Sequence, residues 1–138
     1  MKILTRLTIA LSAAFALALT ASAQDAAGTL PPAATKTGLT YAGDIKALLD
    51  QSCAKCHSGD KPKARLHLDT LEGLLKGSRN GKVVIAGDSA KSLLVQAAAQ
   101  VTEDQDLWMP PAKDAGRFPK LTADQIGLLR AWINQGAK

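Results

Sequence analysis

The sequence predicts an all-α domain of several short helices, and three observations lead to this prediction. Apolar residues recur at helical spacing in the segments 41–52 and 122–136. Two shorter apolar segments, 69–77 and 89–99, carry helix start or stop signals. The one clearly extended stretch, residues 66–68, is very short. Short helices joined by loops therefore make up most of the predicted fold.

The first predicted helix, residues 41–52, leads directly into a Cys-x-x-Cys-His motif formed by Cys53, Cys56 and His57. Two thiols at this spacing, with an imidazole at the next position, fall on one side of a helical turn. Both sulfurs can form thioethers to the two vinyl groups of one porphyrin, and His57 can be the proximal ligand of its iron. The motif therefore predicts one covalently bound haem c.

The two cysteines have three other interpretations. A thioredoxin-like redox pair normally comes with a βαβ setting, which this chain lacks, and it leaves His57 without a role. A structural zinc site needs four ligands, whereas the chain has two cysteines and two histidines, and Cys56 and His57 are adjacent. A plain disulfide between Cys53 and Cys56 is the simplest alternative. We favour haem attachment over all three.

The middle of the chain predicts two short helices. Asp69 opens the first, Glu72 completes an Asp-x-x-Glu capping pattern, and Gly77 ends it. The second starts after Asp88 or Ser89 and continues into a run of three alanines.

Residues 100–120 form a long segment with little periodicity, and a loop of that length in a compact domain is usually functional or disordered. It contains an apolar run stiffened by two prolines, residues 107–111. Met109, inside this run, is the only internal methionine, and its thioether suits the sixth position of an iron held by His57. The alternative is that Met109 fills a gap in the core. Trp108 either shields the haem or lies on a contact surface.

His67 and the basic residues near the motif have surface interpretations. His67 is the only rival imidazole for the sixth position, but leucines alternate with it, which places His67 on the opposite, solvent-facing side. Bis-histidine ligation is the alternative. Lys55, Lys61, Lys63 and Arg65 either rim an exposed haem edge for docking or are solvated loop charges.

The last helix is the clearest one in the sequence. Thr122 and Gln125 form a capping box at its start, and Gly136 stops it. Its apolar stripe includes Trp132, which we expect in the core.

Residues 1–23 predict a cleaved signal peptide. Two basic residues precede an apolar run from Leu7 to Leu19 that is too short for a comfortable membrane span, and a small-residue cleavage signal follows. An uncleaved anchor is the alternative. Export agrees with the motif, because bacterial c-type haem is attached after translocation. We therefore expect a periplasmic protein with no stable membrane insertion.

Composition sets limits on the mature chain. Residues 24–39 are small, polar and proline-containing, which predicts a flexible linker before a single domain, residues 40–138. Without residues 1–23 the chain has 15 basic and 12 acidic residues, a formal charge of +3. That balance argues against nucleic acid as a partner. Aromatic residues are scarce, so few large side chains are available to fill the core. This composition is consistent with a core that a large apolar cofactor completes.

These motifs together resemble the small c-type cytochrome domain described from planctomycetes, a relative of the class I cytochromes c. The resemblance implies a cytochrome c-like fold in which the N- and C-terminal helices cross beside one haem, with His57 as the proximal and Met109 as the distal ligand of the iron. The family often has proline where this chain has Ala86. The resemblance rests on the haem motif and on residues 63–69, 87–89, 92–94, 109–111 and 121–137.

The sequence therefore predicts an electron carrier and not an enzyme. A haem whose axial positions are both filled by the protein has no open site for a substrate. Its encounters with redox partner proteins, both donor and acceptor, should be brief and small in area. One alternative is a haem enzyme or sensor, of peroxidase or gas-binding type, with an open sixth position. Another is a haem-bearing interaction subunit of a larger oxidoreductase.

Overall fold

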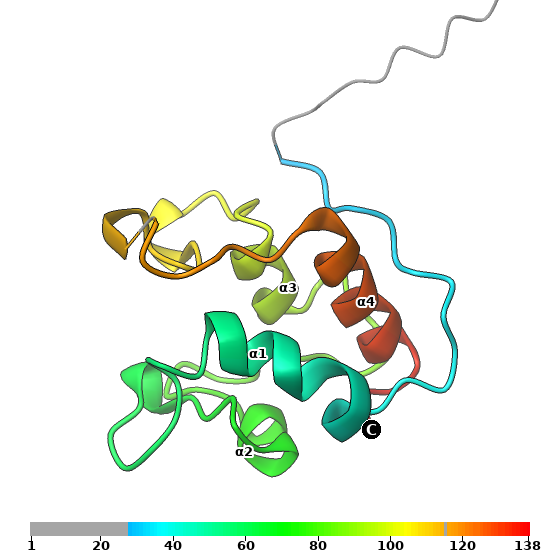
Figure 1. Ribbon diagram of the computed structural model, residues 1–138, viewed down its shortest axis with the longest axis horizontal. Coiled ribbons are helices and arrows are strands. Elements are labelled where there is room, and N and C mark those ends of the chain that lie inside the picture. The colour runs from blue at the N-terminus through cyan, green and yellow to red at the C-terminus, as the bar shows by residue number, and fades with distance from the viewer. Residues whose placement is uncertain (1–27, 115) are drawn as a thin grey trace, which may run out of the picture.

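The computed structural model describes residues 28–114 and 116–138 of the chain (Figure 1). The α-helices are α1 (Lys46–Ser52), α2 (Leu71–Lys76), α3 (Leu93–Ala98) and α4 (Ala123–Asn134). Single helical turns are η1 (Tyr41–Ile45), which continues into α1, and η2 (Lys63–Arg65), η3 (Gln105–Leu107) and η4 (Ala112–Asp114).

Within the described residues there is no β-strand, only an isolated bridge between Ser78 and Gly81. The prediction of an all-α domain is therefore confirmed for the described residues. The expected signal peptide, residues 1–23, lies outside the described residues. No helix in the described part of the chain is long and apolar enough to cross a membrane.

The last helix forms as the sequence predicts. The Thr122 hydroxyl accepts a hydrogen bond from the Gln125 N–H at 3.2 Å, and the Gln125 side chain accepts one from the Thr122 N–H at 2.8 Å. This reciprocal box satisfies two backbone donors that a helix start otherwise leaves free. The apolar stripe of α4, with Trp132 fully buried, then faces α3 and η1.

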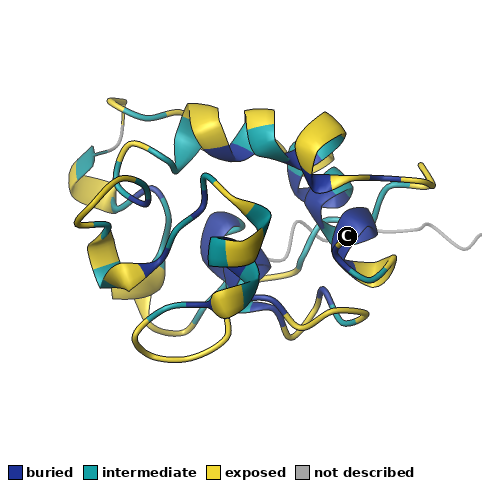
Figure 2. Cartoon of the chain, turned by 90° about the horizontal axis from the view of Figure 1, so that it is seen from below, coloured by how far each residue is buried: buried dark blue, intermediate teal, exposed yellow. Residues whose placement is uncertain are grey.

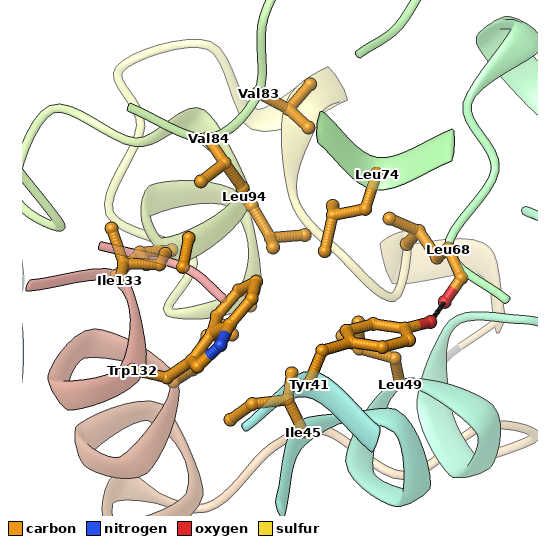
Figure 3. Close-up of a cluster of buried hydrophobic side chains, with 14 of the residues drawn as sticks. Tyr41, Ile45, Leu49, Leu68, Leu74, Val83, Val84, Leu94, Trp132 and Ile133 are labelled. Carbon is orange, nitrogen blue, oxygen red and sulfur yellow. Dashed lines mark hydrogen bonds between the residues drawn. The ribbon is translucent and has the colours of Figure 1, made fainter. Parts of the chain in front are cut away.

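The core joins the two ends of the domain through Tyr41 and Trp132 (Figure 3). Their ring centroids are 6.2 Å apart, a distance at which aromatic pairs interact favourably. Each polar tip is satisfied, because the Tyr41 hydroxyl donates to the Leu68 carbonyl and the Trp132 indole N–H donates to the Lys138 carbonyl, both at 2.8 Å. Figure 2 shows buried residues on the inward sides of the helices, whereas the connecting loops are mostly exposed.

The two middle helices start later than the sequence predicts. Thr70, and not Asp69, caps α2, because the Thr70 hydroxyl accepts a hydrogen bond from the Gly73 N–H at 3.1 Å. Helix α3 begins only after Ser92, whose side chain is occupied in the preceding turn, where it donates to the Asp88 carbonyl at 2.8 Å. Gly77 ends α2 with a positive φ of 92°, as predicted.

Residues 30–39 run along α4, a contact that the sequence gives no sign of (Figure 1). The Ala34 N–H donates to the Gly127 carbonyl at 2.9 Å, and Arg130 donates to the Pro31 carbonyl. The Gln135 side chain donates to the Lys36 carbonyl at 2.8 Å. We call residues 30–39 the N-terminal strap. The sequence predicts a flexible linker here, whereas the structure holds this extended segment by hydrogen bonds.

Candidate functional site

An apolar cavity separates the segment 53–83 from the segment 93–118, and its walls include residues from both. Its walls are mostly apolar side chains with a few polar and sulfur-bearing groups, as is usual for a cofactor site. All four candidate site residues line this one cavity: Cys53, Cys56, His57 and Met109. The structure therefore brings together side chains that are more than 50 residues apart in the sequence.

The haem-attachment motif forms a tight turn directly after α1. The Cys53 N–H donates to the Leu49 carbonyl at 2.8 Å, which extends the helical path by one residue. The N–H groups of Cys56 and His57 both donate to the Cys53 carbonyl at 3.1 Å. These bonds place both thiols and the imidazole on the same wall of the cavity.

Both cysteines are free thiols in the structure and are half-buried. Burial raises the pKa of the Cys53 thiol to about 11, with a smaller contribution from neighbouring Cys56. A thiol with that pKa stays protonated at neutral pH, unlike the low-pKa attacking cysteine of a dithiol oxidoreductase. The raised pKa of Cys53 therefore does not favour the thioredoxin-like interpretation of the motif.

The imidazole of His57 is oriented by a backbone carbonyl. His57 is buried, with 7 % of its surface exposed, and its Nδ1 lies 3.1 Å from the Lys63 carbonyl oxygen. Because a carbonyl oxygen can only accept, Nδ1 carries the proton and Nε2 presents a lone pair. Burial lowers the pKa of His57, opposed by hydrogen bonds to the Lys63 and Leu66 backbone, so the ring is neutral at pH 7.

Met109 lines the same cavity, in a loop held by several hydrogen bonds. The Met109 N–H donates to the Ala97 carbonyl at 3.0 Å, which ties the loop to the end of α3. The Gln100 side chain donates to the Pro110 carbonyl at 3.2 Å and accepts from the Lys120 ammonium at 2.6 Å. The peptide bond between Met109 and Pro110 is cis.

The remaining sequence candidates occupy different places. His67 is 43 % exposed at its side chain, lies 3.6 Å from an Asp69 oxygen and does not line the cavity. Trp108 also lies outside the cavity wall and donates from its indole N–H to the Thr102 carbonyl at 3.1 Å. Of the four basic residues near the motif, Lys55 and Lys63 line the cavity, whereas Lys61 and Arg65 do not.

Part of the cavity wall was not predicted from the sequence. Helix α3 contributes Leu94, Ala97 and Ala98, and the loop before α4 contributes Phe118. The small alanines at the end of α3 are the signal that something bulky approaches that helix, and Phe118 is one of few aromatic residues in the chain. From the sequence alone, the alanines would be assigned to the core and Phe118 to a loop. Only the fold shows that they line the same cavity.

The residues present fit a haem c. The cavity supplies apolar walls, two free thiols from one local turn and a buried neutral imidazole whose Nδ1 lies against the Lys63 carbonyl. The thioether of Met109 adds a second soft donor, of the kind that completes a His/Met haem.

Comparison with protein families finds that residues 53–113 match the family described as Planctomycete cytochrome C. The matched segment starts at the first cysteine of the motif and extends past the Met109 loop. The resemblance predicted from the sequence is thus confirmed over these residues. Comparisons with curated proteins and with solved structures found no match.

Proposed function

Because residues 53–113 match the planctomycete cytochrome c family, whose domain implies haem-based electron transfer, we propose that this protein is an exported mono-haem cytochrome c. In this proposal it moves single electrons between periplasmic redox partners through a haem ligated by His57 and Met109. One observation carries the proposal: Cys53, Cys56 and His57 line the same apolar cavity as Met109.

The chain's own residues would hold the group in a defined way. Cys53 and Cys56 would fix it covalently, and a haem bound there would supply a one-electron iron couple. The Lys63 carbonyl holds the His57 ring in the tautomer that leaves Nε2 free. A carbonyl that accepts from the other ring nitrogen also raises the basicity of a histidine ligand, and so helps to set the reduction potential.

Met109 would fill the remaining axial position, which closes the iron to substrates. The hydrogen bonds from Met109 to Ala97 and from Gln100 to Pro110 support this role, because they hold the loop against α3. Soft methionine sulfur raises the potential of a haem relative to bis-histidine ligation. A rigid loop also changes little when the oxidation state changes, which favours rapid transfer.

The contact between Tyr41 and Trp132 supports a further part of the proposal, that the first and last helices cross beside the haem.

The partners are proposed to be redox proteins that dock briefly near the cavity mouth. Exposed Lys55 and Lys63 at that mouth favour an acidic contact surface on such a partner.

The test is a visible spectrum of the protein matured in a periplasm with haem-attachment machinery, oxidised, then reduced, then with carbon monoxide added. We expect a low-spin c-type spectrum, a far-red band in the oxidised form and no response to carbon monoxide. Met109→Ala should abolish the far-red band, lower the potential and admit carbon monoxide. Leu107→Ala, which changes a neighbouring residue of the cavity wall, should leave all three unchanged.

Carbon monoxide binding by the unaltered protein would contradict the proposal and favour a haem enzyme or gas sensor. An unchanged spectrum and potential in Met109→Ala would remove Met109 as a ligand while leaving haem attachment intact.

A further inference from the structure

A second cleft, separate from the haem cavity, is lined by several basic residues. Arg65, His67, Lys76 and Arg79 all border it, and Asp60 is the one acidic residue on its wall. With His67 neutral, the ionised groups of the wall carry a net charge of +2. The bridge residue Ser78 borders both the cleft and the haem cavity, so the two adjoin at that residue.

The backbone brings these basic residues together from three segments. The Arg79 N–H donates to the Ala64 carbonyl at 2.8 Å, which locks the turn around Ser78 to the η2 turn that carries Arg65. Lys76 comes from the last turn of α2. The next residue, Gly77, has a positive φ, and a Cβ there would lie 2.6 Å from the Gly81 carbonyl oxygen, so only glycine allows this close approach.

Like most cations in the described part of the chain, those of the cleft form no salt bridge with a protein carboxylate; what sets them apart is that they border one recess. Lys36, Lys46 and Lys91 each form a salt bridge with a nearby aspartate. In the described part of the chain, Arg65, Lys76 and Arg79 form none, although all three are held around one recess. Like charges gathered in this way repel each other, and an anion between them removes that repulsion.

We propose that this cleft binds a small, multiply charged oxyanion of the phosphate class. Two guanidinium groups can bind such an anion with paired N–H donors, and the Lys76 ammonium adds a point charge. This inference does not depend on the proposed function. Its location gives it a consequence for the haem site, because Lys63, whose carbonyl orients His57, belongs to the same η2 turn as Ala64, whose carbonyl accepts from Arg79.

The experiment is a titration of the mature, haem-loaded, ¹⁵N-labelled protein with inorganic phosphate, followed by amide NMR at constant ionic strength maintained with sodium chloride. We expect saturable shifts centred on Arg65, Gly77 and Arg79. Arg79→Ala should weaken phosphate binding roughly tenfold, as expected for loss of a hydrogen bond to a charged group. Arg79→Gln should do the same, and exposed Lys113→Ala, outside the cleft, should leave the affinity unchanged.

Shifts that do not saturate, or that sodium chloride produces equally, would overturn the proposal. Equal weakening by Lys113→Ala would overturn it too, since the effect would then be one of overall charge. A parallel arm uses vesicles of phosphatidylglycerol. Pelleting with these vesicles, without saturable phosphate binding, would assign the basic cluster to a lipid headgroup and would overturn the free oxyanion.

Discussion

The two sides of this domain are built differently. Around Trp132 the chain fills its own interior: Trp132, Ile45 and Leu49 are fully buried, and the indole N–H is satisfied by the Lys138 carbonyl. Around His57 the same chain surrounds a cavity whose wall residues, such as Cys53 and Phe118, are only half-buried. We call these the packed side and the cavity side. The difference indicates that the packed side supplies most of the domain's intrinsic stability, and that the cavity side is shaped for a ligand.

The largest expected effect comes from deleting one aromatic ring on each side. Trp132→Ala removes a fully buried side chain and should lower the free energy of unfolding by about 3–5 kcal/mol. Phe118→Ala, the matched change on the cavity side, should cost less than about 1 kcal/mol, because Phe118 is half-buried and lies outside the hydrophobic core. Denaturant titrations of the matured proteins measure both values. Equal losses would mean that the two sides form one cooperative core.

The packed side was largely predictable because its signals are local. The capping box of Thr122 and Gln125, the apolar stripe of α4 and the buried position of Trp132 all follow from residues within one turn or a few turns of each other. The middle helices were less predictable. Asp69 and Thr70 are both good N-cap residues, so the sequence alone does not decide between them, and in the structure Thr70 is the cap. The N-terminal strap was not predictable, because its hydrogen bonds to α4 join residues about 100 positions apart.

The second prediction asks whether the N-terminal strap is part of the packed side. A Cβ at Gly127 would lie 2.8 Å from the Pro32 carbonyl oxygen, so Gly127→Ala should destabilise the protein by roughly 1–3 kcal/mol. In a chain that lacks the strap up to residue 35, this clash disappears. The same substitution should then stabilise the protein by up to about 1 kcal/mol, because alanine favours helix over glycine. Chemical denaturation of the four proteins gives the cycle. If Gly127→Ala changes the free energy of unfolding in the same direction with and without the strap, the strap does not pack closely against α4.

The cavity side illustrates what a motif can and cannot predict. Spacing was enough to propose Cys53, Cys56 and His57 together, because these three residues sit on one local turn. Met109 was proposed only from its chemistry and its prolines, and its place on the same cavity wall depends on a bond to Ala97 that no sequence pattern encodes. The alanines of α3 and Phe118 carry no chemical signal, so only the fold assigns them to the wall.

The third prediction compares the cap of the long helix α4 with the cap of the short helix α2, which lines no part of the cavity. Thr122→Ala removes the side-chain acceptor of a reciprocal box at the start of α4 and should lower the free energy of unfolding by about 1 kcal/mol. Thr70→Ala removes a single capping bond from the much shorter α2 and should cost about 0.5 kcal/mol. Thermal unfolding of both variants, with the conservative changes Thr122→Ser and Thr70→Ser as controls, measures the difference. A larger loss at Thr70 would show that the contribution of a cap does not follow the length of the helix that it starts.

The smallest effect concerns the ion pair that joins the N-terminal strap to η1. A hydrogen bond from Lys36, at 2.7 Å, lowers the pKa of Asp44 below its ordinary value of 3.8, and a bond from the Thr40 N–H lowers it further. Because the folded pKa is the lower one, the pair stabilises the protein fully above pH 3.8, and this contribution is lost as the pH falls through the folded pKa. The Lys36 side chain is mostly exposed to solvent and the Asp44 side chain is half-buried, so the effect on stability should be small and should weaken further in salt.

The titration of the Asp44 carboxyl group, followed by NMR, measures this interaction directly. Lys36→Ala should move its midpoint upward, toward but not as far as 3.8, because the Thr40 bond remains. Asp88, whose pKa is lowered by Lys91, is the internal control and should titrate unchanged in that variant. If the Asp44 midpoint does not move, Lys36 is not held against η1 in solution. The strap would then be held to the packed side by its hydrogen bonds to α4. The Gly127 substitution, made with and without the strap, would show whether those bonds keep the strap in place.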